Sequence, residues 1–193
     1  MNFLPNDFKY TEPTPPSKYF QKIPEGETTI RILDKAQLGW QGWKDAYKED
    51  STKISSPVRI KDNKADSFPM DQFDEEIRDV KFIWAMPIYN FSEKCIQVWA
   101  IPQASIRQAI MSLNRKEKWG DPVNYNIVIE RTGKDMATKY TVSPEPKEEL
   151  EAFINAEYLV WRDNFDWDKW WASEEPFKKA EDIVDVDKIS KEI

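Results

Sequence analysis

The sequence predicts a mainly β domain with five strands and one internal helix, flanked by an N-terminal arm and an acidic C-terminal region. Two observations indicate this class. Short segments alternate between apolar and polar residues and are rich in β-branched and aromatic side chains, as half-buried strands are. Within residues 28–146, a single segment has the period of a helix. At 193 residues, 40% of them hydrophobic, the chain is long enough for one domain with an appendage.

The first 27 residues are expected to form an extended arm. Proline fixes the backbone and removes a hydrogen-bond donor, which disfavours a helix or an interior strand. The prolines of this segment are Pro5, Pro13, Pro15, Pro16 and Pro24. The arm carries three lysines against four acidic residues, so it is not a basic arm.

The first strand is predicted at residues 28–33, where β-branched residues alternate with others. Residues 39–44 are its expected continuation past a bulge at a glycine. Residues 47–79 are polar, mixed in charge and without a period, so we expect a long loop there, with room for a small hairpin near residues 58–60.

The two clearest strands, residues 81–90 and 95–101, are joined by a short polar link and predict a hairpin. A register that pairs Tyr89 with Cys95 places Trp99 on the face opposite the core residues. Trp99 is then expected to be exposed. A slip of one residue would exchange the two faces.

The remaining elements follow in the order helix, strand, turn, strand. Residues 105–116 have apolar side chains at helical spacing, and residues 125–131 and 138–142 alternate as strands around a turn. Five strands with a helix between the third and fourth is the order of a five-stranded OB-fold barrel. Other small α+β domains share this order, so the order alone does not decide the fold.

The C-terminal region, residues 147–193, differs from the domain in charge and pattern. One amphipathic helix is expected around Leu150–Trp161, followed by a mostly flexible tail in which acidic and aromatic residues alternate. Docking of its rings Phe165, Trp167, Trp170 and Trp171 remains open. Residues 145–193 hold 15 acidic and 7 basic residues, whereas residues 1–144 hold 20 and 21. The net charge of −7 therefore belongs to the C-terminal region and does not argue against an anionic partner for the domain.

Several classes of function are disfavoured by composition. The chain has no histidine and one cysteine, Cys95, which removes the usual general base, most nucleophilic triads and most zinc sites. We expect no catalysis, no cofactor and no metal, although a hydrolase with paired carboxylates remains open. We also expect no membrane span and no signal peptide, because no long apolar run is present.

The sequence resembles the zinc-free single-stranded DNA-binding proteins of tailed bacteriophages, a group of OB-fold helix-destabilising proteins. The resemblance spans about residues 18–146 and is carried by short runs: YF (19–20), EGETTIRIL (25–33), GWQGW (39–43), KFIWA (81–85), VWAIP (98–102), KWGDP (118–122) and TKY (138–140). It implies a protein that coats single strands in phage DNA replication, recombination or repair, in the cytoplasm of the bacterial host. It also implies an acidic tail that contacts replisome proteins. The chain departs from the T4-like members because it cannot build their zinc site.

Binding of single strands without sequence selection needs cations along the backbone and aromatic faces on which bases stack. The candidate residues, from the strands and loops that an OB-fold uses, are Trp40, Trp43, Lys44, Tyr47, Lys48, Arg59, Lys61, Tyr89, Phe91, Lys94, Trp99, Arg131, Lys134, Lys139 and Tyr140. For each tryptophan, packing in the core is the competing interpretation.

The tail has its own candidates for partner binding: Phe165, Trp167, Trp170, Trp171, Glu174 and Glu175. We expect its carboxylates and indoles to compete with DNA for the groove, so that deletion after about residue 162 would tighten binding. A different class also remains open, an OB-like module that uses its aromatic face for a protein partner and binds no nucleic acid.

Overall fold

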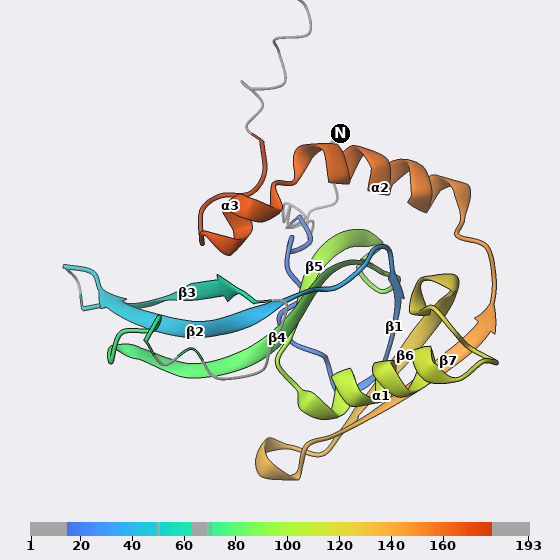
Figure 1. Cartoon of the computed structure of the whole chain (residues 1–193), viewed down its shortest axis with the longest axis horizontal. Helices are drawn as coiled ribbons and strands as arrows, with labels where there is room; N and C mark the ends of the chain where they lie inside the picture. The colour runs from blue at the N-terminus through green and yellow to red at the C-terminus, as the bar shows by residue number, and fades with distance from the viewer. Residues whose placement is uncertain (1–14, 50, 63–68, 70, 179–193) are drawn as a thin grey trace, which may run out of the picture.

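The computed structural model describes residues 15–49, 51–62, 69 and 71–178 (Figure 1). Within these residues the strands are β1 (Gly26–Ile32), β2 (Gln37–Tyr47), β3 (Lys53–Lys61), β4 (Ile77–Asn90), β5 (Cys95–Ile101), β6 (Tyr125–Thr132) and β7 (Lys139–Lys147). The α-helices are α1 (Ala104–Arg115), α2 (Ala152–Asn164) and α3 (Trp167–Trp171), and short 3-10 turns cover Pro122–Asn124 and Asp135–Ala137. The mainly β class predicted from the sequence is confirmed.

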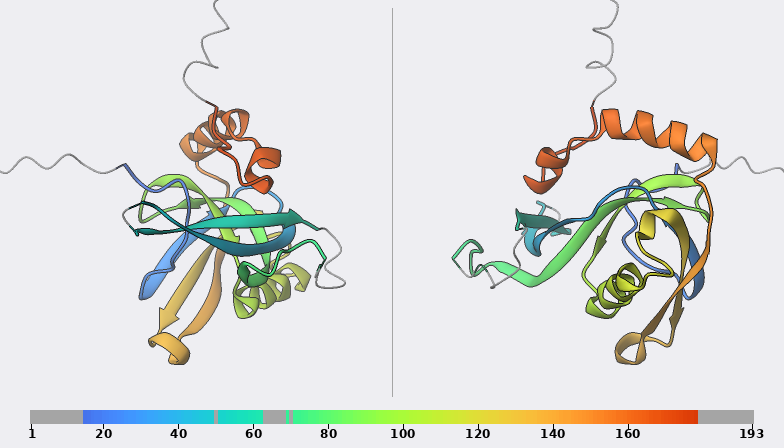
Figure 2. Two further views of the ribbon diagram at one scale, coloured as in Figure 1. Left: turned by 90° about the vertical axis from the view of Figure 1, so that its left-hand side faces the viewer. Right: turned by 45° about the vertical axis from the view of Figure 1, so that its right-hand side comes forward.

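The strands form one antiparallel sheet in the order β3-β2-β4-β1-β6-β7, with β5 also paired to β4. The second half of β4 pairs with β1 and β5, and its first half pairs with β2. The sheet curls around α1, while β2, β3 and the first half of β4 protrude from it as a three-stranded extension (Figures 1 and 2). In the described residues β5 and β7 do not pair, so the sheet does not close into a complete barrel.

Residues 53–61 form strand β3, not the loop predicted from the sequence. β3 pairs with β2 along its whole length, from Gly39 opposite Lys61 to Tyr47 opposite Lys53. Its sequence contains two serines and a proline, which weaken a strand pattern. Pro57 is tolerated because β3 is an edge strand, where a missing N–H leaves no neighbour unpaired.

The main core lies between the curled sheet and α1. Ile30, Ile88 and Ile127 from three paired strands are completely buried. Helix α1 contributes Ile106 and Ile110 from one face, as the helical spacing predicted. This core holds the second half of β4 in place, and β4 in turn carries the extension.

The register of β4 and β5 differs by one residue from the prediction, because Asn90 rather than Tyr89 pairs with Cys95. The Asn90 side chain accepts hydrogen bonds from the backbone N–H groups of Ser92 and Glu93, which fixes the turn directly after Asn90. Consequently Trp99 points into the core against Phe20, and only 2% of it is exposed. The expected exposure of Trp99 was wrong.

Residues 165–178, here called the C-terminal segment, fold back onto the sheet beside α2 (Figure 2). Phe165, Trp170 and Trp171 are buried against Ile83 and Val98. These residues therefore follow the docked alternative that was left open for their rings rather than the mostly flexible tail, and the rest of that tail lies outside the described residues. Helix α2 matches the predicted helix. No helix in the described part of the chain is long and apolar enough to span a membrane.

The N-terminal arm was predicted over residues 1–27, and its first 14 residues lie outside the described part. Residues 18–20 lie within the described part. They run along the free edge of β5, where Phe20 N–H donates to Val98 O at 3.0 Å and Val98 N–H donates to Lys18 O at 3.0 Å. This pairing covers an edge that would otherwise expose unpaired backbone groups.

Replacement Trp170→Ala should lower the free energy of unfolding by about 3–5 kcal/mol, since it removes a buried indole and leaves a cavity. Met136→Ala is the matched control, because Met136 is fully exposed and its loss should change the value by less than about 0.5 kcal/mol. Urea unfolding followed by circular dichroism measures both. Equal stability of the two variants would contradict the docking of the C-terminal segment.

Candidate nucleic-acid interface

A cleft of about 980 Å³ lies on the outer face of the sheet, the face that carries Ile83 and Val98. The extension forms one side and the C-terminal segment and residues 19–22 form the rest. Its polar and aromatic lining consists of Tyr19, Phe20, Gln21, Lys22, Gln41, Trp43, Ser55, Arg59, Arg78, Asp79, Lys81, Trp170, Ser173 and Glu174. Four cations, two acids and four aromatic rings therefore meet in one concave surface.

The strand register places these side chains on one face. Gln41 lies opposite Arg59 on β3 and Lys81 on β4, and Trp43 lies opposite Pro57 and Arg78. Because side chains alternate along a strand, residues 41 and 43 share a face with residues 57 and 59.

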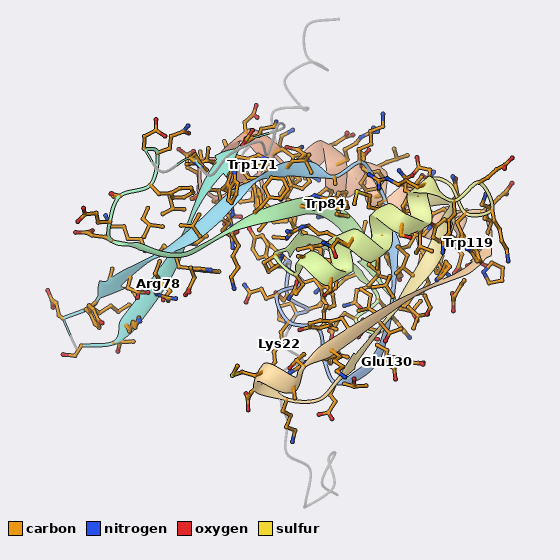
Figure 3. All side chains as sticks on the ribbon, turned by 60° about the horizontal axis from the view of Figure 1, so that its bottom comes forward. Lys22, Arg78, Trp84, Trp119, Glu130 and Trp171 are labelled. Atoms are coloured by element: carbon orange, nitrogen blue, oxygen red, sulfur yellow. The ribbon has the colours of Figure 1, made fainter. Side chains whose placement is uncertain are left out.

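A β-bulge in β4 brings a further cation to the cleft. Gln41 and Trp43 are two residues apart, but their partners Lys81 and Arg78 are three apart. The extra residue is accommodated at Asp79, whose φ is +55°. Without it, Arg78 and Lys81 would point to opposite faces of the strand. Figure 3 shows Arg78 on the extension and Trp171 where the C-terminal segment meets it.

Arg59 is fixed at the wall of the cleft. Its Nε donates to Gln41 Oε1 at 2.9 Å, and its Nη1 donates to the backbone oxygen of Trp170 at 2.9 Å. The guanidinium carbon lies 4.0 Å from the centre of the Trp170 ring, a cation–π contact. Burial lowers the pKa of the guanidinium to about 10, so Arg59 is still a cation at neutral pH.

Arg78 shares its charge with two carboxylates. Its Nε lies 2.7 Å from Asp45 Oδ2, and its Nη1 lies 2.6 Å from Asp79 Oδ2. These hydrogen bonds raise the pKa of Arg78 and hold the pKa of the Asp45 carboxyl far below its usual range. In the described part of the chain Lys22 and Lys81 form no ion pair, so they are the cations of the cleft with the least compensated charge.

Of the predicted candidates on the extension, Trp43 and Arg59 line the cleft and the others do not. Trp40 lies on the opposite face, where its ring packs edge-on against Phe82 at 5.3 Å. Lys44 also faces away from the cleft. Its Nζ lies 2.9 Å from Glu76 Oε2, and this hydrogen bond raises the pKa of Lys44.

Three further candidates of the extension are exposed but lie outside the cleft: Tyr47, Lys48 and Lys61. Tyr47 and Lys48 lie at the end of β2, beyond Trp43.

The candidates near the turn between β4 and β5 do not form a stacking surface. Tyr89 is 4% exposed, and its ring packs edge-on against Phe91 at 5.1 Å and Phe153 at 6.1 Å beneath α2. Phe91 is half-buried and Lys94 is exposed. Helix α2 packs over the rings of Tyr89 and Phe91, which the sequence placed among the candidates for base stacking.

The candidates of the β6–β7 hairpin form a separate group. Lys134 and Lys139 are exposed near its tip, while Tyr140 packs against the main core. Arg131 Nη1 donates to the backbone oxygen of Ile23 at 3.1 Å. None of the four lines the cleft.

The aromatic residues predicted to bind partners are used within the fold. Phe165, Trp170 and Trp171 are buried, and Trp167 is half-buried against Phe165, with ring centres 4.8 Å apart. Trp171 Nε1 donates to Gln37 Oε1 at 2.8 Å. These rings therefore have a structural role within the chain, and their assignment as partner-binding residues stays a prediction. The carboxylates remain exposed: Glu174 lines the cleft, and Glu175 lies 3.9 Å from Lys18.

Sequence reasoning missed Tyr19, Lys22, Arg78 and Lys81. Tyr19 and Lys22 belong to the segment that was predicted as an extended N-terminal arm, and it contributed no candidate to the site. The signal for Arg78 and Lys81 was weak, since their common face depends on the bulge. Among the described residues no cluster of three or more Asp, Glu or Cys side chains is suited to hold a metal ion.

Comparison of the chain with protein-family models, with curated proteins and with solved structures finds no match, so the geometry of the cleft carries the functional argument alone.

Proposed function

We propose that this protein binds single-stranded DNA in the cleft, without sequence selection and without catalysis. The observation that carries the proposal is the meeting of Trp43 with Lys22, Arg59 and Lys81 in one concave surface. A strand bound there would place phosphates near the cations and a base against the indole, which is the requirement for sequence-independent binding. The expectation of no catalysis rests on the absence of histidine, the usual general base, from the chain.

We further propose that the sheet is a variant of the OB-fold barrel. β1 and β2 together would be the first strand, β4 and β5 the second and third, and β6 and β7 the last two. α1 lies between β5 and β6, where an OB-fold has its helix, and β3 would be an insertion. The OB-fold binds oligonucleotides on the face of its second and third strands. The cleft lies on the outer face of β4 and β5, which supports the same function.

The role implied by the resemblance is protection of single strands in phage DNA replication, recombination or repair, in the cytoplasm of the bacterial host. In this proposal the tail contacts replisome proteins through its acidic residues, because its best-packed rings are buried. Its regulatory part would be the pair Glu174 and Glu175 at the rim of the cleft, where carboxylates occupy space that phosphates would need.

Replacement Trp43→Ala should weaken binding of oligo(dT) by about 1–3 kcal/mol, because one stacking surface is lost. Fluorescence anisotropy of a labelled oligonucleotide measures the dissociation constant. Tyr47→Ala is the control, an exposed ring on the same strand but outside the cleft, and it should have the smaller effect. Unchanged affinity of the Trp43→Ala protein would argue against the cleft as the site.

Replacement Lys81→Gln should reduce the slope of log affinity against log salt by about one, since one phosphate contact is lost. Lys116→Gln, at an exposed lysine outside the cleft, should leave the slope unchanged. If the wild-type protein does not bind oligo(dT) at any salt concentration, the alternative of an OB-like protein-interaction module is favoured.

The double replacement Glu174→Gln and Glu175→Gln should tighten binding a few-fold at low salt, and the gain should vanish as salt screens the carboxylates. This change keeps the buried rings, whereas deletion after residue 162 would also remove Trp170 and Trp171 and destabilise the fold. Titrations at low and high salt measure the effect. Equal affinities at low salt would show that these carboxylates do not regulate the cleft.

A further inference from the structure

A second pocket, of about 260 Å³, lies between α1 and the inner face of the sheet, the face that carries the main core. Trp84 and Met86 line it from β4, and Ile110 and Met111 line it from α1. Trp84 is only half-buried, whereas Met86 on the same face is 1% exposed. Figure 3 shows Trp84 where β4 passes α1. The pocket is therefore an apolar recess at the surface of the main core, with an indole in its wall.

The exposed end of this pocket carries charged side chains. Asp34 and Lys35 come from the link between β1 and β2, and Asp121 comes from the turn after α1. All three are exposed. Among the described residues that line the pocket, two carboxylates therefore accompany one cation. This excess of negative charge favours a cationic ligand over an anionic one.

The two carboxylates are held in position but are not neutralised. Asp34 Oδ1 accepts from the Lys35 backbone N–H at 2.7 Å, and Asp34 Oδ2 accepts from the Tyr158 hydroxyl at 2.7 Å. Asp121 Oδ1 accepts from the Val123 backbone N–H at 3.2 Å. In the described part of the chain neither carboxylate forms an ion pair. Both are thus fixed acceptors with charge left for a ligand.

We propose that this pocket binds a small organic molecule that has an apolar body and a protonated amine. The body lies against Trp84 and the two methionines, whose flexible side chains adapt to the shape of a ligand. The amine lies at the exposed end, near Asp34 and Asp121. An apolar recess with a few placed polar groups is the usual form of a small-molecule site.

The size of the pocket limits the ligand. Its volume corresponds to about nine water molecules at ~30 Å³ each. This is too small for a segment of peptide and matches a free molecule such as phenethylamine, an aromatic ring with a short aminoalkyl chain. Its primary amine is protonated at neutral pH, as the amine of lysine is.

This inference does not depend on the proposed function, because the pocket and the cleft lie on opposite faces of β4. Trp84 and Met86 face the main core, whereas Ile83 lines the cleft on the outer face. Saturation of the protein with oligo(dT) should therefore leave the binding of phenethylamine unchanged. Displacement of the amine by oligo(dT) would place it in the cleft and overturn the proposal.

Methionine methyl NMR of the whole chain locates the bound probe. Titration with phenethylamine should shift the signals of Met86 and Met111, both with the same dissociation constant. Met136 is the internal control, since it is fully exposed and lies outside the pocket, so its signal should stay in place. Signals of Met86 and Met111 that do not move, or that move no more than the signal of Met136, would overturn the proposal.

A series of probes of similar size tests the chemical class of the ligand. Phenethylamine should bind about five-fold more tightly than 2-phenylethanol, the amount that a partly exposed ion pair contributes, and phenylacetate should bind most weakly. The same methyl shifts measure all three affinities. Equal affinities of the amine and the alcohol would exclude recognition of a cation.

Replacement Asp121→Asn assigns the charge to a residue. The amide oxygen of asparagine still accepts from the Val123 N–H, so the turn is kept while the negative charge is lost. The affinity for phenethylamine should fall several-fold and that for 2-phenylethanol should not change. Asp135→Asn, at an exposed acid outside the pocket, is the matched control and should alter neither. An equal effect of the two replacements on the amine would contradict a role for Asp121.

Discussion

Strand β4 is the element on which the rest of the structure depends. Its second half pairs with β1 and β5 in the body, and its first half pairs with β2 in the extension. Its alternate side chains serve two hydrophobic clusters, with Met86 and Ile88 facing the main core and Ile83 and Ala85 facing the C-terminal segment. Because β4 is continuous, the extension and the body share one outer face. The cleft spans that face, so its geometry depends on the packing of β4.

The C-terminal segment is a fixed part of this arrangement. Gly39 has no side chain, and a Cβ atom there would lie 2.5 Å from the Trp171 ring, so the ring packs directly on the backbone of β2. Burial of a large aromatic side chain contributes roughly 1.5–3 kcal/mol. Three such rings together approach the whole net stability of a typical domain, about 5–15 kcal/mol. Displacement of the segment from the sheet would therefore be costly, so the proposed regulation is confined to its exposed carboxylates.

The sequence predicted those elements whose pattern is local. Helix α1 and the strands β4, β5, β6 and β7 were found because their side chains repeat with the period of the element. Strand β3 was missed, because its hydrogen bonds to β2 rather than its own composition hold it extended. Docking of the C-terminal segment was left open for a similar reason: acids alternate with rings there without a period, and only the sheet surface shows which rings are buried.

The site was less predictable than the fold, because it depends on register. A shift of one residue between β4 and β5 decided whether Trp99 is a binding surface or part of the core. The bulge at Asp79 decided whether Arg78 faces the cleft. Neither is encoded in a local pattern that a single sequence displays. Trp43 and Arg59 were found because aromatic and cationic residues in adjacent strands are a chemical signal that does not need the register.

The distribution of charge explains how an acidic protein can present a cationic cleft. On the extension, Asp45 pairs with Lys53 and Arg78, and Glu76 pairs with Lys44. Asp45 thus neutralises Lys53 at the end of the extension and Arg78 in the cleft, and Glu76 neutralises Lys44 on the far face, while Lys22 and Lys81 keep their charge in the cleft. The electrostatic potential in the cleft, where we propose that DNA binds, is set by these nearby groups rather than by the net charge of −7. Salt screens charges that are more than about 8–10 Å away. The same screening confines the influence of Glu174 and Glu175 to the rim, where they can oppose a phosphate without cancelling the cations at the wall.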